Sequence, residues 1–198
     1  MAVTDILITP AKIWKAPVAE ALPDETSVAY GASWGGNWEN VGYTLEPLSM
    51  SYNRELFELE VEQVTGVVKR RVTKETLMME TTLAEATPDN LQLAIGGAVT
   101  STSAGASQVA FEDLDAGGDV QLDELAWGFE GFYENASGTQ FPVRIFVYKA
   151  TAILNGQLQF AKAAAAGVPI QISAEADTSK SVGSQLIKFQ RVTAAATS

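Results

Sequence analysis

Apolar and polar residues alternate one by one in several separate stretches of this chain. In VPIQISAEAD, apolar residues occupy every second position from Val168 to Ala176. LMMETTLAE has the same period, and one of its sides is formed by Leu77, Met79, Thr81 and Leu83. Because successive side chains of a strand point to opposite faces, both stretches are predicted strands with one buried face.

Other stretches are also predicted to be strands. In FELEV, we expect Phe57, Leu59 and Val61 to face the core, opposite a row of glutamates. The remaining candidates are KIWKAPV near Trp14, GYTLEPLSMSY at 42–52, LAWGFEGFYE at 125–134, FPVRIFVYKATAIL at 141–154, and QLQFAKA at 157–163. Short strands between Gly, Asn and Ser clusters are typical of sandwiches and barrels. We therefore expect a mainly β fold, a β-sandwich or barrel with one short flanking α-helix and a long hairpin arm.

The helix is predicted in TPDNLQLAIGG. Thr87 can cap its N-terminus, Pro88 suits the first turn, and Gly96 or Gly97 can end it. A helix of about two turns is stable only when it packs against the rest of the protein. We expect Leu91 and Ile95 to make these contacts. The next stretch, AVTSTSAGAS at 98–107, is predicted to be a flexible loop.

The chain of 198 residues is compatible with one domain. We expect a single domain over 1–198, with an extended N-terminal segment at about 1–35 and a short flexible C-terminal tail at about 193–198. The N-terminus lacks the pattern of a secretory signal, and no run approaches the roughly 18 apolar residues of a membrane span. We therefore expect synthesis in the cytoplasm and no membrane partner.

Composition excludes several functions. The chain has 13 Lys and Arg against 24 Asp and Glu, a net charge of −11, which argues against tight binding of nucleic acid. It contains neither Cys nor His. Disulfide frameworks, thiolate zinc sites, cysteine nucleophiles and imidazole bases are therefore excluded together. We expect no cofactor and no enzyme activity.

A weak calcium-loop match lies in DLDAGGDVQLDE. Asp113, Asp115 and Glu124 take positions 1, 3 and 12 of the loop, with Gly118 at position 6. Position 5 is Gly117, which supplies no ligand, and the flanking segments look extended rather than helical. An acidic turn between strands is the stronger interpretation, so we expect no metal.

Two groups of side chains allow a functional and a structural interpretation. Glu58, Glu60 and Glu62 could include a glycosidase acid pair, but nothing in the sequence raises one pKa above the others. A solvated or channel-lining face is more common for such charge runs. Trp34 and Trp38 could stack on sugars, although tryptophans beside a Gly-Gly turn more often pack a loop onto the core.

Cations cluster after the FELEV strand, in a chain that is otherwise acidic. The cluster comprises Lys69, Arg70, Arg71 and Lys74. It is small for a nucleic-acid patch and lacks interleaved aromatic residues. One half of an electrostatic joint between copies is the better interpretation, because every copy also carries acidic surface.

The order of motifs resembles that of the major tail proteins, or tail tube proteins, of long-tailed bacteriophages. The resemblance rests on AKIWKAPVAEALPDETSV, WENVGYTLEPLSMSY, VEQVTGVVKRRVTKETLMMETTLAEATPDNLQLAIGG and FAKAAAAGVPIQISAEAD. The run from Trp38 to Gly97 is its most specific part. The resemblance implies hexameric rings that stack into a tube, with a β-lined channel through which double-stranded DNA leaves without specific binding. It also implies location in the virion tail and partners such as the terminator, tape measure and distal tail protein.

The resemblance suggests roles for particular residues. We expect a hairpin from Tyr52 to Thr82 whose tip, Gln63 to Lys74, reaches the adjacent ring. The expected contact residues are Gln63, Lys69, Arg70, Arg71 and Lys74, and the candidate channel-facing residues are Glu58, Glu60 and Glu62.

Three alternatives remain open from the sequence. Another ring-forming component, such as a tail terminator or a type VI secretion inner tube protein, would share fold and hexamer. A carbohydrate-binding sandwich would use Trp34, Trp38 and Trp127. A glycosidase-like β protein would require a functional acid pair.

Overall fold

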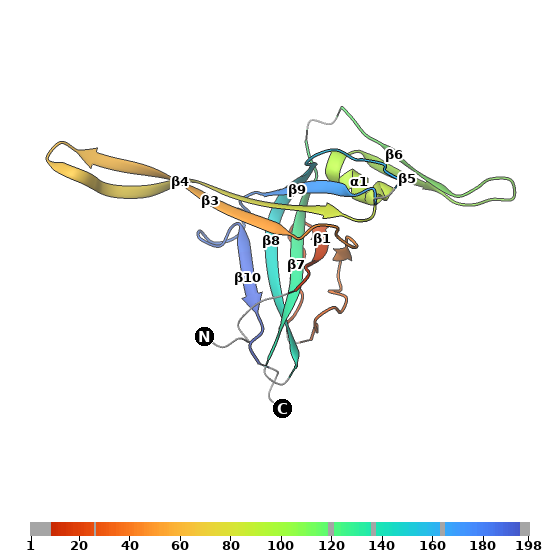
Figure 1. Cartoon of the computed structure of the whole chain (residues 1–198), viewed down its shortest axis with the longest axis horizontal. Coiled ribbons are helices and arrows are strands. Elements are labelled where there is room, and N and C mark those ends of the chain that lie inside the picture. The colour runs from red at the N-terminus through yellow and green to blue at the C-terminus, as the bar shows by residue number, and fades with distance from the viewer. Residues whose placement is uncertain (1–8, 26, 119–120, 136–137, 163–164, 195–198) are drawn as a thin grey trace.

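The computed structural model describes residues 9–25, 27–118, 121–135, 138–162 and 165–194. This part of the chain forms ten strands and one helix (Figure 1). The strands are β1 (Lys12–Pro17), β2 (Glu39–Asn40), β3 (Ser49–Val61), β4 (Val64–Leu83), β5 (Ala98–Thr102), β6 (Phe111–Asp115), β7 (Glu124–Glu134), β8 (Gln140–Leu154), β9 (Val168–Ala174) and β10 (Ile187–Arg191). The helix is α1 (Pro88–Ile95). The expected fold class, mainly β with one short helix, is confirmed.

Strand β8 connects two layers of one antiparallel sheet. The sheet order is β2-β1-β7-β8-β9-β4-β3, and β10 also pairs with β8. The first half of β8 pairs with β10 over Val143–Val147, whereas its second half pairs with β9 over Ala150–Leu154. Figure 1 shows β9, β4 and β3 crossing the direction of β1, β7 and β8. In sandwiches whose layers cross, the corners are formed by strands that pass from one layer to the other.

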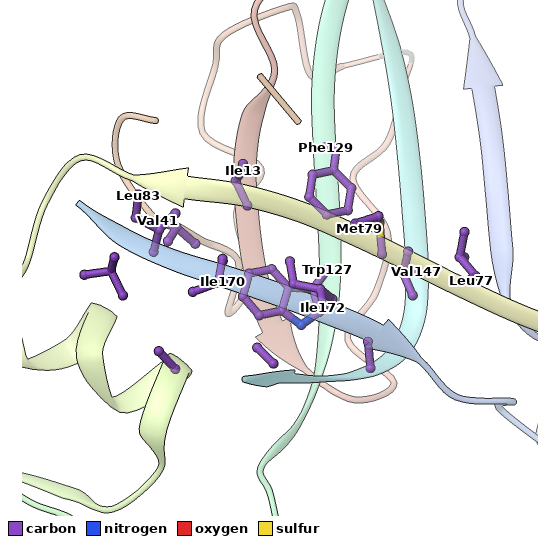
Figure 2. Close-up of a cluster of buried hydrophobic side chains, with 14 residues drawn as sticks. Ile13, Val41, Leu77, Met79, Leu83, Trp127, Phe129, Val147, Ile170 and Ile172 are labelled. Atoms are coloured by element: carbon purple, nitrogen blue, oxygen red, sulfur yellow. The ribbon is translucent and has the colours of Figure 1, made fainter. Parts of the chain in front are cut away.

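The main core lies between these two layers (Figure 2). Apolar residues of β4 and β9 meet those of β1, β7 and β8; the largest fully buried side chains among them include Leu77, Met79, Ile170, Ile172, Ile13 and Trp127. The alternating patterns of β4 and β9 bury the predicted faces, since Leu77, Met79, Thr81, Leu83, Val168, Ile170 and Ile172 are all buried. Both predicted strands are confirmed.

A second core covers the opposite face of β1, β7 and β8. Trp34 and Trp38 come from the segment between β1 and β2 and are both 5% exposed. Trp34 stacks on Trp14 with ring centroids 5.0 Å apart, and both Trp34 and Trp38 contact Phe146. The central strands are thus buried on both faces, which explains why β7 and β8 lack a clear alternation.

Gly128 allows Trp34 to lie directly on β7. A Cβ at this position would overlap two ring carbons of Trp34. We expect Gly128→Ala to lower the free energy of unfolding by about 1–3 kcal/mol, because the closely packed ring has to shift. Chemical denaturation checks this value. Gly66→Ala is the matched control, since a Cβ at Gly66 meets no atom within 4 Å and should leave stability nearly unchanged.

The helix begins and ends as predicted. Thr87 caps it by accepting a hydrogen bond from the Asn90 backbone N–H at 3.2 Å, and Gly96 ends it with φ of 74°. Its packing differs from the prediction in one position. Leu91 contacts the core, whereas Ile95 is 45% exposed, and the buried residues are Asn90 and Ala94. Asn90 is held by hydrogen bonds to the carbonyls of Val41 and Glu85.

Three predictions about loops and strands were wrong in whole or in part. The stretch 98–107 is not only a loop, because Ala98–Thr102 forms β5 and pairs with β6 in a second hairpin. The predicted strand 157–163 does not form in 157–162, and residue 163 lies outside the described residues. Of the predicted strand 42–52, residues 49–52 belong to β3, whereas 42–48 meet the sheet at a bridge between Thr44 and Leu83. Among the residues that the structure describes, no helix is long and apolar enough to cross a membrane.

Candidate functional site

Strands β3 and β4 form a long arm that projects from the body (Figure 1). Every residue of β3 is exposed, and the arm's half of β4 is exposed except for the half-buried Val67. Burial starts only at Leu77, where β4 enters the core. In the described part of the chain, β3 pairs with β4 alone and forms one end of the sheet order. The arm therefore contributes little to the core and leaves a long strand edge unpaired.

The turn of the arm is at Glu62 and Gln63, between the paired residues Val61 and Val64. The sequence predicts the four cations at the tip of the hairpin; in the structure Gln63 is at the turn, whereas the four cations lie further along β4. Lys69 faces Leu59, and Lys74 faces Glu55. The register shifts on each side of this segment: β4 has one extra residue between the pairs Glu55–Lys74 and Leu56–Val72, and three extra residues between Leu59–Lys69 and Val61–Val64. Such irregularities twist the strands locally.

The arm exposes many large apolar side chains. They are Met50, Tyr52, Leu56, Phe57, Leu59, Val61, Val64, Val68 and Val72, each between 38% and 57% exposed. The prediction that Phe57, Leu59 and Val61 face the core was therefore wrong for this chain alone. Contiguous exposed apolar surface on a soluble protein commonly marks an interaction surface.

Ion pairs across the arm neutralise only some of its charges. Arg70 pairs with Glu58 at 2.6 Å and Lys74 with Glu55 at 3.5 Å. Arg54 pairs with Glu75 at 2.9 Å, and its hydrogen bonds to the Tyr52 hydroxyl raise the pKa of its guanidinium. Exposed pairs of this kind contribute at most about 1 kcal/mol each.

Lys69 and Arg71 have no ion pair or side-chain hydrogen bond within the described residues. Residues directly opposite each other in an antiparallel pair share a face. The pairs Leu59–Lys69 and Phe57–Arg71 therefore lie on one face, which we name the basic face. It combines unpaired positive charge with exposed apolar side chains.

The other face of the arm carries most of the candidate acids. Glu58 lies there opposite Arg70, and Glu60 shares this face by alternation. Glu62 is in the turn, so its side chain is not fixed to this face by the strand. All three glutamates are exposed.

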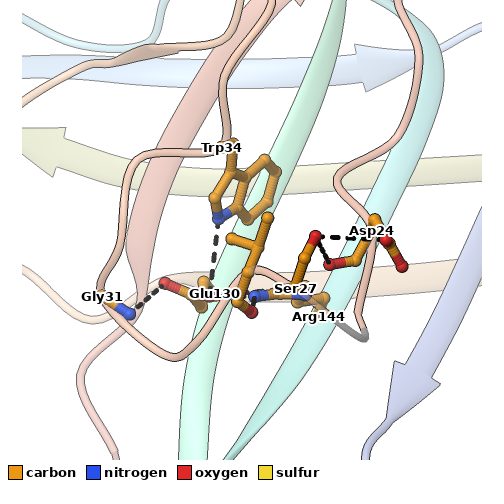
Figure 3. Close-up of polar contacts among 7 residues, drawn as sticks. Asp24, Ser27, Gly31, Trp34, Glu130 and Arg144 are labelled. Atoms are coloured by element: carbon orange, nitrogen blue, oxygen red, sulfur yellow. Dashed lines mark hydrogen bonds and ion pairs between the residues drawn. The ribbon is translucent and has the colours of Figure 1, made fainter.

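A buried ion pair that sequence reasoning missed joins the neighbouring strands β7 and β8 (Figure 3). Glu130 on β7 and Arg144 on β8 face each other, are 0% and 1% exposed, and pair at 3.0 Å. Glu130 also accepts hydrogen bonds from the Gly31 backbone at 3.0 Å and the Trp34 indole at 3.4 Å. Arg144 donates to the Val28 carbonyl at 2.6 Å. Both charges thus anchor the segment between β1 and β2.

The calcium-loop match is spread over two strands. Asp113 and Asp115 lie on β6, and Glu124 begins β7, so strands replace the helices that an EF-hand requires. Residues 119–120 of this stretch lie outside the described residues. Among the residues described, no group of three acidic side chains could hold a metal ion.

The tryptophans proposed for sugar binding are buried. Trp34 and Trp38 are each 5% exposed and Trp127 is 0% exposed. They pack in the two cores described above rather than forming a surface platform. The structure therefore removes the observation on which the carbohydrate-binding alternative was based.

Comparison with known proteins agrees with this architecture. A family model described as phage tail tube protein matches residues 4–194. A search of curated proteins finds no match. The match spans nearly the whole chain and includes the arm, the helix and both core layers. The chain belongs to the phage tail tube protein family, with a structural role in the virion tail.

Proposed function

We propose that this protein assembles into hexameric rings that stack to form the tail tube. The observation that carries the proposal is the arm, which exposes apolar side chains and an unpaired strand edge at the same place. Unpaired edges and exposed apolar surface favour association, and cyclic symmetry closes such contacts into rings. Neighbouring copies of the chain would cover this surface.

The channel of the tube would be acidic and would conduct double-stranded DNA into the host. Glu58, Glu60 and Glu62 are the candidate channel-facing residues, in a chain of net charge −11. DNA binds proteins chiefly through neutralised phosphates. A wall of like charge would leave DNA free to slide without specific binding.

The tube would contact other tail proteins at its ends, such as a terminator and a distal tail protein, and would enclose a tape measure protein. The family match over 4–194 supports a single tail-tube domain. Synthesis would take place in the host cytoplasm, before assembly into the virion.

The inter-ring contact would involve Gln63, Lys69, Arg70, Arg71 and Lys74. Substituting the four cations by Glu is expected to prevent stacking, because it replaces attraction between copies with repulsion while the residues stay exposed. Negative-stain microscopy of concentrated protein, with sedimentation across a salt series, measures the result.

Two controls separate stacking from folding. The thermal midpoint of the isolated variant should stay within a few degrees of that of the parent, because the four residues lie outside both cores. Substituting the same residues by Gln removes attraction without adding repulsion, so its effect should be intermediate. Tubes of the Glu variant with unchanged salt resistance would show that the inter-ring joint lies elsewhere.

A further inference from the structure

We propose that the arm of one copy docks on the β5–β6 hairpin of another copy and places Lys69 and Arg71 against Asp113 and Asp115. This inference rests on the self-assembly proposed above and names the surface that receives the arm. Three properties of the two hairpins carry it: their charge, their exposed apolar residues and their positions on the body.

The basic face of the arm offers charge without a partner. Lys69 and Arg71 make no ion pair within the described residues, unlike Arg70 and Lys74 beside them. Phe57 and Leu59, directly opposite Arg71 and Lys69, are 57% and 42% exposed. A partner for this face has to supply negative charge and apolar contact together.

The β5–β6 hairpin offers the complementary combination. Phe111, Asp113 and Asp115 alternate along β6 and therefore share one face. Phe111 is 45% exposed, and neither aspartate forms an ion pair within the described residues. We name this the acidic face.

The acidic face points away from the body. Leu114 and its strand partner Val99 lie on the other face of the hairpin and are half-buried, and α1 packs beside both strands. The opposing residues on the acidic face are Ala98, Thr100 and Thr102, which are small and carry no charge. The aspartates and Phe111 are therefore accessible to a partner chain.

Charge is segregated along the sequence as well. No Lys or Arg occurs between Lys74 and Arg144, so no cation of the hairpin competes for the acidic face. Unpaired cations lie on one hairpin and unpaired acids on the other. Complementary charge of this kind selects the partner and fixes its register.

The two hairpins extend from opposite sides of the body, as Figure 1 shows. One copy cannot bring its own arm to its own β5–β6 hairpin, so the contact requires a second copy. Contacts between two different surfaces of identical chains are head-to-tail and continue from copy to copy. Repetition of the contact is what assembly of many subunits needs.

A charge swap tests the contact. We expect Arg71→Glu and Asp113→Lys each to raise the protein concentration needed for assembly about tenfold, because each places like charges together. The combination of both changes in one chain restores opposite charges and should recover most of the loss. Lys162→Glu, an exposed change of the same size on neither hairpin, is the control and should leave assembly unchanged.

Cross-linking gives an independent readout, because the natural chain has no Cys. Val61→Cys on the arm and Thr100→Cys on the acidic face are mixed as separate chains and treated with a short bis-maleimide reagent. Cross-linked dimers are expected from this mixture. Val61→Cys mixed with Ser181→Cys, an exposed site outside both hairpins, should give far fewer.

The outcomes distinguish this inference from the proposed function. If the parent assembles but Arg71→Glu and Asp113→Lys behave like Lys162→Glu, the inference fails while the tube proposal stands. Recovery by the swap, together with cross-linking of arm to hairpin, supports both. A parent that stays monomeric, together with no cross-link between the Val61→Cys and Thr100→Cys chains under the same conditions, overturns both.

Discussion

Arg144→Met is expected to lower the free energy of unfolding by about 3–5 kcal/mol, the range found when one partner of a buried ion pair is removed. Glu130 would remain at 0% exposure, without the guanidinium that pairs with it at 3.0 Å. The Val28 carbonyl would also lose its 2.6 Å hydrogen bond. Both effects act on the segment that carries Trp34, so the second core should loosen with the pair.

Denaturant unfolding, monitored by tryptophan fluorescence, measures this loss of unfolding free energy, because Trp34 lies beside the pair. Arg70→Met is the matched control: it breaks the Arg70–Glu58 pair on the arm, which is exposed, and should cost less than about 1 kcal/mol. Equal effects of the two substitutions would mean that the buried pair does not anchor the segment between β1 and β2.

Alternation in the sequence predicts strands well where the chain covers its own faces. Val168, Ile170 and Ile172 are buried as their spacing indicates, and so are Leu77 and Met79. The helix follows from local chemistry alone, since the Thr87 cap and Gly96 act within a few residues. These predictions are correct because the contacting residues belong to the same chain.

Alternation in FELEV led to a wrong prediction for a physical reason. The pattern indicates that Phe57, Leu59 and Val61 share a face, and it does not indicate which molecule covers that face. No other described part of the chain covers it, and the three side chains are 38% to 57% exposed. A prediction of burial from one sequence assumes that the cover lies in the same chain.

The β5–β6 hairpin was missed because its composition is typical of loops. AVTST and the residues after it are mostly small and polar, and the half-buried residues of β5 and β6 are Val99, Thr102 and Leu114. The hairpin is held by backbone pairing, which begins at Ala98 and Asp115. This pairing cannot be read from the types of side chain in the segment. Such strands depend on long-range pairing more than on intrinsic preference.

The sequence contains a signal for the buried Glu130–Arg144 pair. Each residue is a lone charge inside an otherwise apolar strand, in GFEGF and in PVRIF. Charged residues are rarely fully buried unless they are paired. Two such residues of opposite sign, on consecutive predicted strands, are candidates for a buried pair.

Removal of the arm is expected to abolish assembly and to leave the folded body intact. The change replaces residues 55–74 by Asn-Gly, a two-residue turn suited to a hairpin. It joins Arg54 to Glu75, which already face each other and pair at 2.9 Å. Because none of the removed residues is buried, the free energy of unfolding should change by less than about 1 kcal/mol.

Sedimentation and microscopy measure assembly of the truncated chain, and denaturant unfolding measures its stability. Leu77→Ala is the opposite control: it keeps the arm but empties a core position that is 1% exposed, so it should cost about 2–5 kcal/mol of stability. The two variants separate the role of the exposed half of β4 in assembly from the role of its buried half in stability.

Normal tubes from the truncated chain would refute an assembly role for the arm, and a truncated chain that fails to fold would show that the body depends on the arm. A stable monomer is expected, since β4 beyond Glu75 belongs to the core and β4 before it has only β3 as a partner in the described structure.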